Sequence, residues 1–273
     1  MKVENVSNKN RRSVVTEVVE FDSLNEFYDY ICKTPFNSAF RWSSHHSVEG
    51  KFNFTKTQNF EEAVDYFKHG WESKTKEIAQ RLRIEENKSE MLTSRKNVLS
   101  PNGYQAIVPL YLNGVPNNMV SSKMVTVKRK VVTLNKSIAY SAVVDSSVIE
   151  EESIKAFRLI KRMEKQGYRI NLNLVLGLDY PSRYLVKIRL KSAGEKLNVS
   201  KMVFPLVHPS MLRRLFFRFI EVHPTISAGF VGGYGTPMDS SEIRELTPGE
   251  YLLPNIIRKN IDVIKSLEDL ENL

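Results

Sequence analysis

The pattern of apolar and polar residues near the amino terminus predicts a short strand followed by a helix. Between residues 16 and 21 apolar and polar side chains alternate, which favours a strand. Asp22 and Ser23 then supply side-chain oxygens that can cap a helix running to residue 31. Pro35 ends this helix.

A longer amphipathic helix is predicted from Asn59 to Leu82, because apolar side chains recur there at helical spacing. Gly70 lies inside this segment and indicates a bend or a close approach of another element. The polar run from residue 85 to residue 100 has no strong period. Residues 101–103, Pro-Asn-Gly, predict a turn at the junction between the two halves of the chain.

In the second half of the chain, predicted strands and helices alternate as they do in proteins with a parallel β-sheet. In residues 123–134 β-branched side chains alternate with Lys and Arg, which predicts a strand or hairpin. Residues 137–145 form a continuous apolar run, typical of a strand covered on both faces. A helix over residues 153–166 and a second apolar strand over residues 168–178 follow. This strand, helix and strand predict a right-handed parallel crossover.

The remainder of the chain predicts further strands and helices. Residues 184–192 alternate apolar with basic side chains, which favours a partly exposed strand antiparallel to its neighbour. Residues 202–207 are another apolar strand candidate, and Pro209 opens a predicted helix that extends to Ile220. The glycine-rich residues 228–237 predict a loop, and residues 256–270 a terminal helix.

Charge is distributed unevenly along the 273 residues. The chain carries 40 basic and 31 acidic residues, for a net charge of +9. Residues 111–220 hold 20 basic and 7 acidic groups, whereas residues 221–273 hold 4 and 9. This asymmetry favours an anionic partner such as nucleic acid for the middle of the chain. An acidic tail that packs against the basic middle is the alternative.

Cysteine content and hydropathy place the chain in a reducing compartment. Cys32 is the single cysteine, so neither an intramolecular disulfide nor a cysteine-based zinc site is expected. Its apolar neighbours predict a small buried side chain. The sequence shows no signal-peptide core and no apolar stretch of membrane-spanning length. We therefore expect a cytoplasmic protein.

The end of the apolar run at residues 137–145 carries candidate metal ligands. Asp145 and Ser147, followed by a long helix and a second strand, resemble the opening of a von Willebrand factor A (vWA) domain. In that family an Asp-x-Ser-x-Ser motif binds Mg²⁺, and Ile149 stands here in place of the second serine. Asp179, in the loop after the second strand, is the third candidate ligand. The alternative is that Asp145 and Ser146 only cap the helix.

Most of the chain also resembles a family of proteins of unknown activity from tailed phages of Gram-positive bacteria. The matching segments are residues 60–71, FEEAVDYFKHGW, and residues 201–217, KMVFPLVHPSMLRRLFF. The resemblance implies a phage or prophage origin and hence action in the host cell.

Together these patterns predict an α/β fold. Its second half, residues 101–273, is expected to form a vWA-like or Rossmann-like sheet with flanking helices. A smaller, mostly helical α+β region is expected over residues 14–100, after a disordered terminus at residues 1–13, which are polar and rich in Asn, Ser, Lys and Arg.

The strongest local signal for binding is a cluster of arginines on the helix after Pro209. Arg213, Arg214 and Arg218 lie close together there, and the last two are four residues apart, so they share a helix face. Guanidinium groups in this arrangement suit phosphate or carboxylate, and Lys128, Arg129 and Lys130 could add phosphate contacts. A solvated helix face with internal ion pairs is the alternative.

Other catalytic signatures are missing from the sequence. It contains no Gly-x-Ser-x-Gly elbow, Walker A loop or Rossmann fingerprint, and its five histidines lack the HExxH spacing of zinc enzymes. The adjacent His45 and His46 point in different directions in any regular backbone. In the glycine-rich loop, Phe230 and Tyr234 are candidates to stack on a base or a partner side chain.

Three functions are compatible with this pattern. The first is a non-enzymatic phage protein that binds a protein or nucleic-acid partner in the host cytoplasm, without a cofactor. The second is a metal-dependent phosphate-handling enzyme that uses Mg²⁺ at Asp145, Ser147 and Asp179. The third, which follows from the phage resemblance alone, is a modulator or trigger of bacterial antiphage defence.

Overall fold

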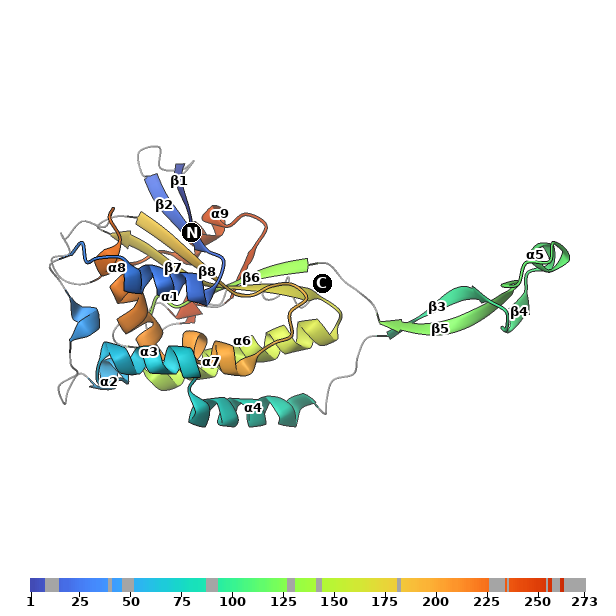
Figure 1. Ribbon diagram of the computed structural model, residues 1–273, viewed down its shortest axis with the longest axis horizontal. Helices are drawn as coiled ribbons and strands as arrows, with labels where there is room; N and C mark the ends of the chain where they lie inside the picture. Colours follow the sequence, from blue (N-terminus) through green and yellow to red (C-terminus); the bar gives the residue numbers. More distant parts are fainter. Residues whose placement is uncertain are drawn as a thin grey trace.

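The computed structural model describes residues 1–7, 15–38, 41–45, 52–86, 93–126, 131–140, 144–180, 183–225, 234, 236–253, 255–256 and 261–262. These residues form a mixed sheet covered by helices, and a long arm extends away from it (Figure 1). Within these ranges, no helix combines the length and the apolar character needed to cross a bilayer.

The central sheet combines strands from both ends of the chain. In spatial order it contains β1 (Lys2–Ser7), β2 (Val15–Phe21), β8 (Arg183–Lys191), β7 (Arg169–Tyr180), β6 (Val131–Ser137) and β10 (Tyr251–Leu252). β2 runs parallel to β8, β8 antiparallel to β7, and β6 parallel to β7 and β10. A short strand β9 (Thr236–Pro237) also pairs with β7. The predicted α/β class is therefore confirmed.

Helices cover the two faces of the sheet unequally. One face is covered by α1 (Leu24–Lys33), α3 (Phe60–His69), α6 (Ser146–Lys165), α7 (Val199–Val207), the π-helical turn η2 (Met211–Phe216) and α8 (Phe217–Val222). Outside this layer lie η1 (Trp42–Ser44), α2 (Phe52–Thr55) and α4 (Glu72–Glu86), which contact η2, α7 or α6. The other face is covered by α9 (Ser240–Leu246).

The main hydrophobic core lies between the sheet and the larger helical layer. Along β7, Ile170 belongs to this core, whereas Val175 belongs to a smaller cluster beneath α9. The rings of Phe27 and Phe216 lie 4.9 Å apart in the main core, and Phe27 meets Phe21 edge-on at 5.3 Å. Burial of these apolar surfaces provides most of the driving force that fixes the helices on the sheet.

The predicted strand, helix and strand unit is present, with its first strand displaced. β6, α6 and β7 form it, and β6 runs parallel to β7. The prediction that residues 137–145 form the first strand is wrong, because β6 spans residues 131–137 and residues 138–140 are buried without regular structure. Only residues 131–134 of β6 fall within a predicted strand or hairpin, because Asn135 and Lys136 interrupt the apolar pattern, although both side chains are buried.

The segment at residues 123–134 is neither one strand nor a hairpin. β5 (Met119–Thr126) ends within it and β6 begins at Val131, and the two strands belong to different sheets. Residues 184–192 do form the predicted antiparallel strand as β8, but this strand is mostly buried.

Several predictions for the first half also change. Residues 2–7 of the terminus predicted to be disordered form β1, and residues 8–14 lie outside the described residues. β1 and β2 belong to the same sheet as the strands of the second half. The long helix predicted from residue 59 is two helices, α3 and α4. The break is at Gly70, whose φ of +84° suits glycine.

The predicted strand at residues 202–207 is wrong, because these residues lie in α7. Asn198 caps this helix by accepting a hydrogen bond from the Lys201 amide at 3.1 Å. Every side chain from Met202 to Val207 is buried, so the segment is apolar on all sides and shows no helical period. A short apolar run of this kind fits a buried helix as well as a strand. The helix predicted after Pro209 is confirmed as η2 and α8.

Residues 256–270 were predicted to form a helix. The described part of this segment contradicts that prediction, because β11 (Asn255–Ile256) and β12 (Ile261–Asp262) pair as short antiparallel strands. Of the predicted loop at residues 228–237, only Tyr234 and the strand β9 are described.

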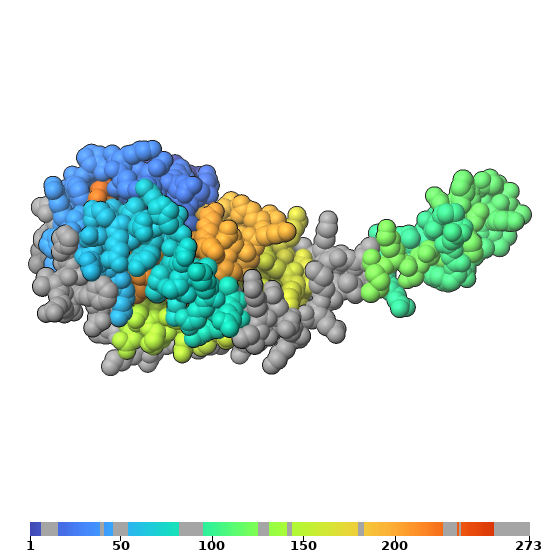
Figure 2. All heavy atoms as spheres, turned by 60° about the horizontal axis from the view of Figure 1, so that its bottom comes forward, coloured from blue at the N-terminus to red at the C-terminus, as the bar shows by residue number. Residues whose placement is uncertain are grey.

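Residues 93–126, called the arm below, form a ribbon that leaves the body. β3 (Thr93–Ser100) pairs antiparallel with β5, and β4 (Gln105–Ala106) pairs with the opposite side of β5. A helical turn, α5 (Val108–Leu112), forms the tip. Figures 1 and 2 show the arm standing clear of the sheet and its helices. The polar run at residues 85–100, which has no strong period, therefore contains β3.

Candidate functional site

The arginine cluster predicted to bind phosphate is buried. Arg214 is only 1% exposed and Arg213 is buried as well. Arg214 donates hydrogen bonds to the backbone carbonyls of Ser43 at 3.0 Å, Thr57 at 3.2 Å and Gln58 at 3.1 Å. The expectation of an exposed phosphate-binding face is therefore wrong, and so is the alternative of a solvated face. The guanidinium groups of Arg213 and Arg214 donate hydrogen bonds to main-chain oxygens inside the protein.

The other two arginines have similar internal roles. Arg213 donates to the Phe54 carbonyl and lies over the Phe54 ring at 4.0 Å, and burial lowers the pKa of Arg213 to about 10. Arg218 lies over the Phe60 ring at 4.0 Å and donates to the Ser43 hydroxyl at 2.9 Å. Cation–π contacts of this kind offset part of the cost of removing the charge from water.

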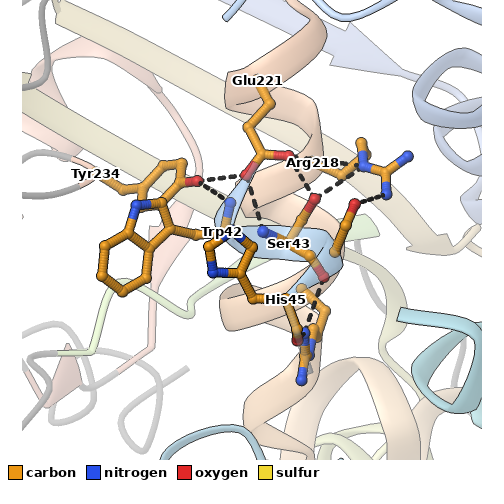
Figure 3. A network of polar contacts seen from close by, with 8 residues as sticks. Trp42, Ser43, His45, Arg218, Glu221 and Tyr234 are labelled. Atoms are coloured by element: carbon orange, nitrogen blue, oxygen red, sulfur yellow. Dashed lines mark hydrogen bonds and ion pairs between the residues drawn. The ribbon is translucent and has the colours of Figure 1, made fainter. Parts of the chain in front are cut away.

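Glu221 is the acceptor at the centre of this network (Figure 3). Its carboxylate is fully buried and accepts hydrogen bonds from the Ser43 amide at 2.8 Å, the Ser43 hydroxyl and the Tyr234 hydroxyl. Arg218 lies 3.7 Å from the same carboxylate. Burial and the Glu221 charge raise the pKa of Tyr234. These hydrogen bonds hold residues 42–44 against α8.

Tyr234 does not present an exposed stacking surface as predicted. Its ring stacks on Phe217 with the centroids 4.0 Å apart, and its hydroxyl accepts from the Trp42 amide at 3.1 Å. Phe230, the other candidate in that loop, lies outside the described residues.

One of the three predicted metal ligands, Asp179, has a cationic partner in the described structure. Asp179 forms an ion pair with Arg183 at 2.7 Å, and Arg183 also contacts Glu242 at 2.8 Å. Asp145 is exposed at the start of α6, and Ser147 follows in the first turn. Asp145 occupies the N-cap position, as the alternative predicted, but its side chain makes no capping hydrogen bond. Nowhere in the described ranges do three His, Cys, Asp or Glu side chains gather as a metal site would require.

Cys32 and the histidines offer little chemistry. Cys32 is exposed, contrary to the prediction of a buried thiol, because it falls on the outer side of α1. His208 is buried against Phe204 and Trp71, and burial lowers the pKa of His208 to about 3. It is therefore a packing residue. His45 stacks on Trp42, and His46 lies outside the described residues.

A second buried polar cluster lies where β6 meets α6. Lys136 is 1% exposed, and burial lowers its pKa to about 8, although the nearby Glu152 carboxylate opposes this change. Burial and Glu152 raise the pKa of the neighbouring Tyr140, and Arg213 opposes that rise. The sequence pattern does not indicate this cluster, because a lysine inside an alternating segment ordinarily marks the solvent side of a strand.

Replacing Lys136 by methionine should remove a pH dependence of stability. Between pH about 8 and 10.5 the Lys136 amine is protonated in the unfolded chain and neutral in the folded chain. The free energy of unfolding of the wild type therefore rises with pH in this range, by up to about 3 kcal/mol. The Lys136→Met variant should lack this rise and be more stable at pH 7. Urea unfolding at pH about 7 and 9.5 measures both, with the exposed Lys196→Met as the control. Identical pH profiles for Lys136→Met and wild type would contradict the assignment.

The arm carries three exposed basic side chains and six exposed large apolar side chains. Lys96 and Lys123 face each other directly across β3 and β5, and both are exposed, as is Arg95. From residue 91 to residue 144 the sequence contains no Asp or Glu. No residue from 95 to 124 is buried. The ribbon is therefore an uncompensated positive surface.

The tip of the arm is apolar. Its exposed side chains are Tyr104 at 64%, Val108 at 61%, Tyr111 at 66% and Leu112 at 76%. Val108, Tyr111 and Leu112 have the i, i+3, i+4 spacing that places side chains on one face of a helical turn. Exposed aromatic and aliphatic groups grouped in this way mark a contact surface.

Hydrogen bonds hold the tip in shape even though it has no buried side chain. The amide of Ile107 donates to the Asn118 carbonyl at 2.7 Å, and the Val115 amide donates to the Leu110 carbonyl at 3.0 Å. At Gly103 the chain crosses β5 so closely that a Cβ atom would lie 2.1 Å from the Val120 carbonyl oxygen. Glycine is therefore required there, and the Pro-Asn-Gly turn was the one sequence signal of this tip.

A basic surface on the body leads to the root of the arm. Lys155, Arg158 and Arg162 are exposed along α6, which ends at the same side of the body as the arm (Figure 1). Arg169 pairs with Val131, and β6 is the first described element after the arm. Lys128, Arg129 and Lys130 fall outside the described residues, so the structure does not place these predicted phosphate contacts.

These features define a mixed α/β protein with a projecting, basic β-arm. The chain belongs to a family described as a domain of unknown function (DUF7192), whose model matches residues 5–271. Searches of curated proteins and of solved structures returned no match.

Proposed function

We propose that this chain is a non-enzymatic phage protein that binds nucleic acid in the host cytoplasm through its arm. The observation that carries the proposal is the pair Lys96 and Lys123 on an exposed ribbon whose own sequence contains no Asp or Glu. Like charges directly opposite each other destabilise a ribbon on its own. An anion that lies across the pair removes this repulsion, and a row of phosphates provides such an anion.

The dimensions of the arm suit a duplex. β3 has eight residues, which span about 27 Å at about 3.4 Å per residue. A groove of B-DNA about 12 Å wide admits a two-stranded ribbon. The exposed basic residues of α6 give the same nucleic acid a second contact on the body.

The other parts of the proposal have separate support. The phage origin and the host cytoplasm are supported by the resemblance of residues 60–71 and 201–217 to the phage family described above. The β6–α6–β7 unit supports a degenerate vWA-like domain. The pairing of Asp179 with Arg183 weighs against the alternative of a metal-dependent enzyme.

Charge reversal on the ribbon should weaken binding to a fluorescent duplex. Each phosphate contact releases counterions, so the double variant Lys96→Glu, Lys123→Glu should reduce the log–log salt slope by about 2. Affinity at low salt should fall about tenfold or more. Fluorescence anisotropy over a range of NaCl concentrations measures both quantities.

The matched control is Lys196→Glu with Lys201→Glu, which reverses two exposed lysines of the body that lie outside the arm. This variant has the same net charge as the arm variant, and its salt slope should stay close to that of the wild type. If the wild type retards neither DNA nor RNA at low salt, the proposal fails and a protein partner becomes the better interpretation. Equal losses in the two variants would show that net charge, and not the arm, governs binding.

A further inference from the structure

The arm carries its charges on the ribbon near the body and its exposed aromatic side chains at the tip. The described basic residues Arg95, Lys96 and Lys123 lie on the ribbon near the body, whereas Tyr104 and α5 lie at the far end. A nucleic acid whose backbone follows the ribbon would therefore meet uncharged aromatic and aliphatic groups at the tip. Phosphates gain nothing from these groups, but the faces of bases do.

The size of the tip decides which bases it can reach. A helical turn with its side chains is about 10–12 Å across. The minor groove of B-DNA is about 6 Å wide, so an intact minor groove excludes the tip. The major groove is wide enough, but it presents mainly polar base edges to Tyr111 and Leu112. Stacking on Tyr104 or Tyr111 requires bases that have left the helical stack.

We propose that the tip recognises unpaired bases, so that the preferred partner is a nucleic acid with an unpaired segment next to a duplex. This inference rests on the proposed function of the arm and adds the class of nucleic acid. The hydrogen bonds within residues 107–118 hold the tip in one conformation before binding. Little ordering of the tip is then needed when a base stacks on it.

The test compares two DNA duplexes of equal length and charge, one fully paired and one with a short internal loop of unpaired thymines. Stacking contributes strongly for each base, so the wild type should bind the looped duplex about tenfold tighter or more. The variant Tyr104→Ala, Tyr111→Ala should lose this preference. It should keep the affinity of the wild type for the paired duplex and the same salt slope, because its basic residues are unchanged.

The variant Tyr104→Phe, Tyr111→Phe keeps both rings and should keep the preference, which separates stacking from a disturbed tip. Equal affinity of the wild type for the two duplexes would overturn the inference and leave the proposed function intact. An alanine variant that retains the preference would also overturn it. If the wild type binds neither duplex at low salt, the proposed function and this inference fail together.

Discussion

Replacing Arg214 by alanine should lower the free energy of unfolding by about 3–5 kcal/mol. The side chain is almost completely buried, and its guanidinium donates to backbone carbonyls of two separate segments, including Ser43 and Thr57. Alanine would remove these hydrogen bonds, although Thr57 keeps the Thr55 hydroxyl as a donor to its carbonyl, and would open a cavity. Urea unfolding followed by tryptophan fluorescence measures the change as a lower midpoint at an unchanged slope.

Two further variants make this test specific. Arg214→Lys keeps the charge but has a single nitrogen, which cannot reach carbonyls on both segments, so it should recover only part of the stability. Arg244→Ala removes an exposed arginine from α9 and should change the free energy of unfolding by about 0.5 kcal/mol or less. A loss below about 1 kcal/mol for Arg214→Ala would show that the hydrogen bonds of Arg214 contribute little to stability.

The same arginines show which property of the site could not be predicted from the sequence. Their helical spacing was correctly recognised, but spacing does not reveal which way a helix face points. The carbonyl that receives Arg214 belongs to Ser43, 171 residues earlier in the chain. No local sequence pattern connects the two positions. The arginines were therefore predicted to form an exposed phosphate-binding face, although Arg214 is buried and bonded to the backbone.

Elements with a clear hydrophobic period were predicted well. β2, α1, β7 and the helix after Pro209 each bury one face or a continuous apolar run against the core. Prediction failed for β6 and α7, where burial and polarity do not follow the usual pattern. In β6 the polar side chain of Asn135 is buried and donates to Glu250 at 2.7 Å. In α7 apolar residues occupy every side of the helix.

The arm was missed for a related reason. A hydrophobic period reveals the face that an element buries. In the arm, none of residues 95–124 is buried. Its signals were instead the Pro-Asn-Gly turn and the absence of acidic residues from 91 to 144. The uneven charge along the chain directed attention to residues 111–220, whereas Arg95 and Lys96 of the proposed interface precede that range.

Deleting the arm should separate binding from folding. In a variant whose residues 93–126 are replaced by a short Gly-Ser linker, no member of the main core is removed, since none of the core residues lies in that range. The melting temperature of the body should therefore stay within about 2 °C of the wild-type value. Affinity for the looped duplex should fall on the order of a hundredfold, because the ribbon cations and the tip rings are lost together.

The residual binding of this variant is informative. The exposed Lys155, Arg158 and Arg162 of α6 remain, so weak binding with a smaller salt slope should persist. Adding Arg158→Glu and Arg162→Glu to the deletion should abolish it. Circular dichroism and differential scanning calorimetry establish that each variant is folded before anisotropy is measured. A deletion variant that stays folded and binds as tightly as the full chain would place the interface on the body and remove the arm from the mechanism.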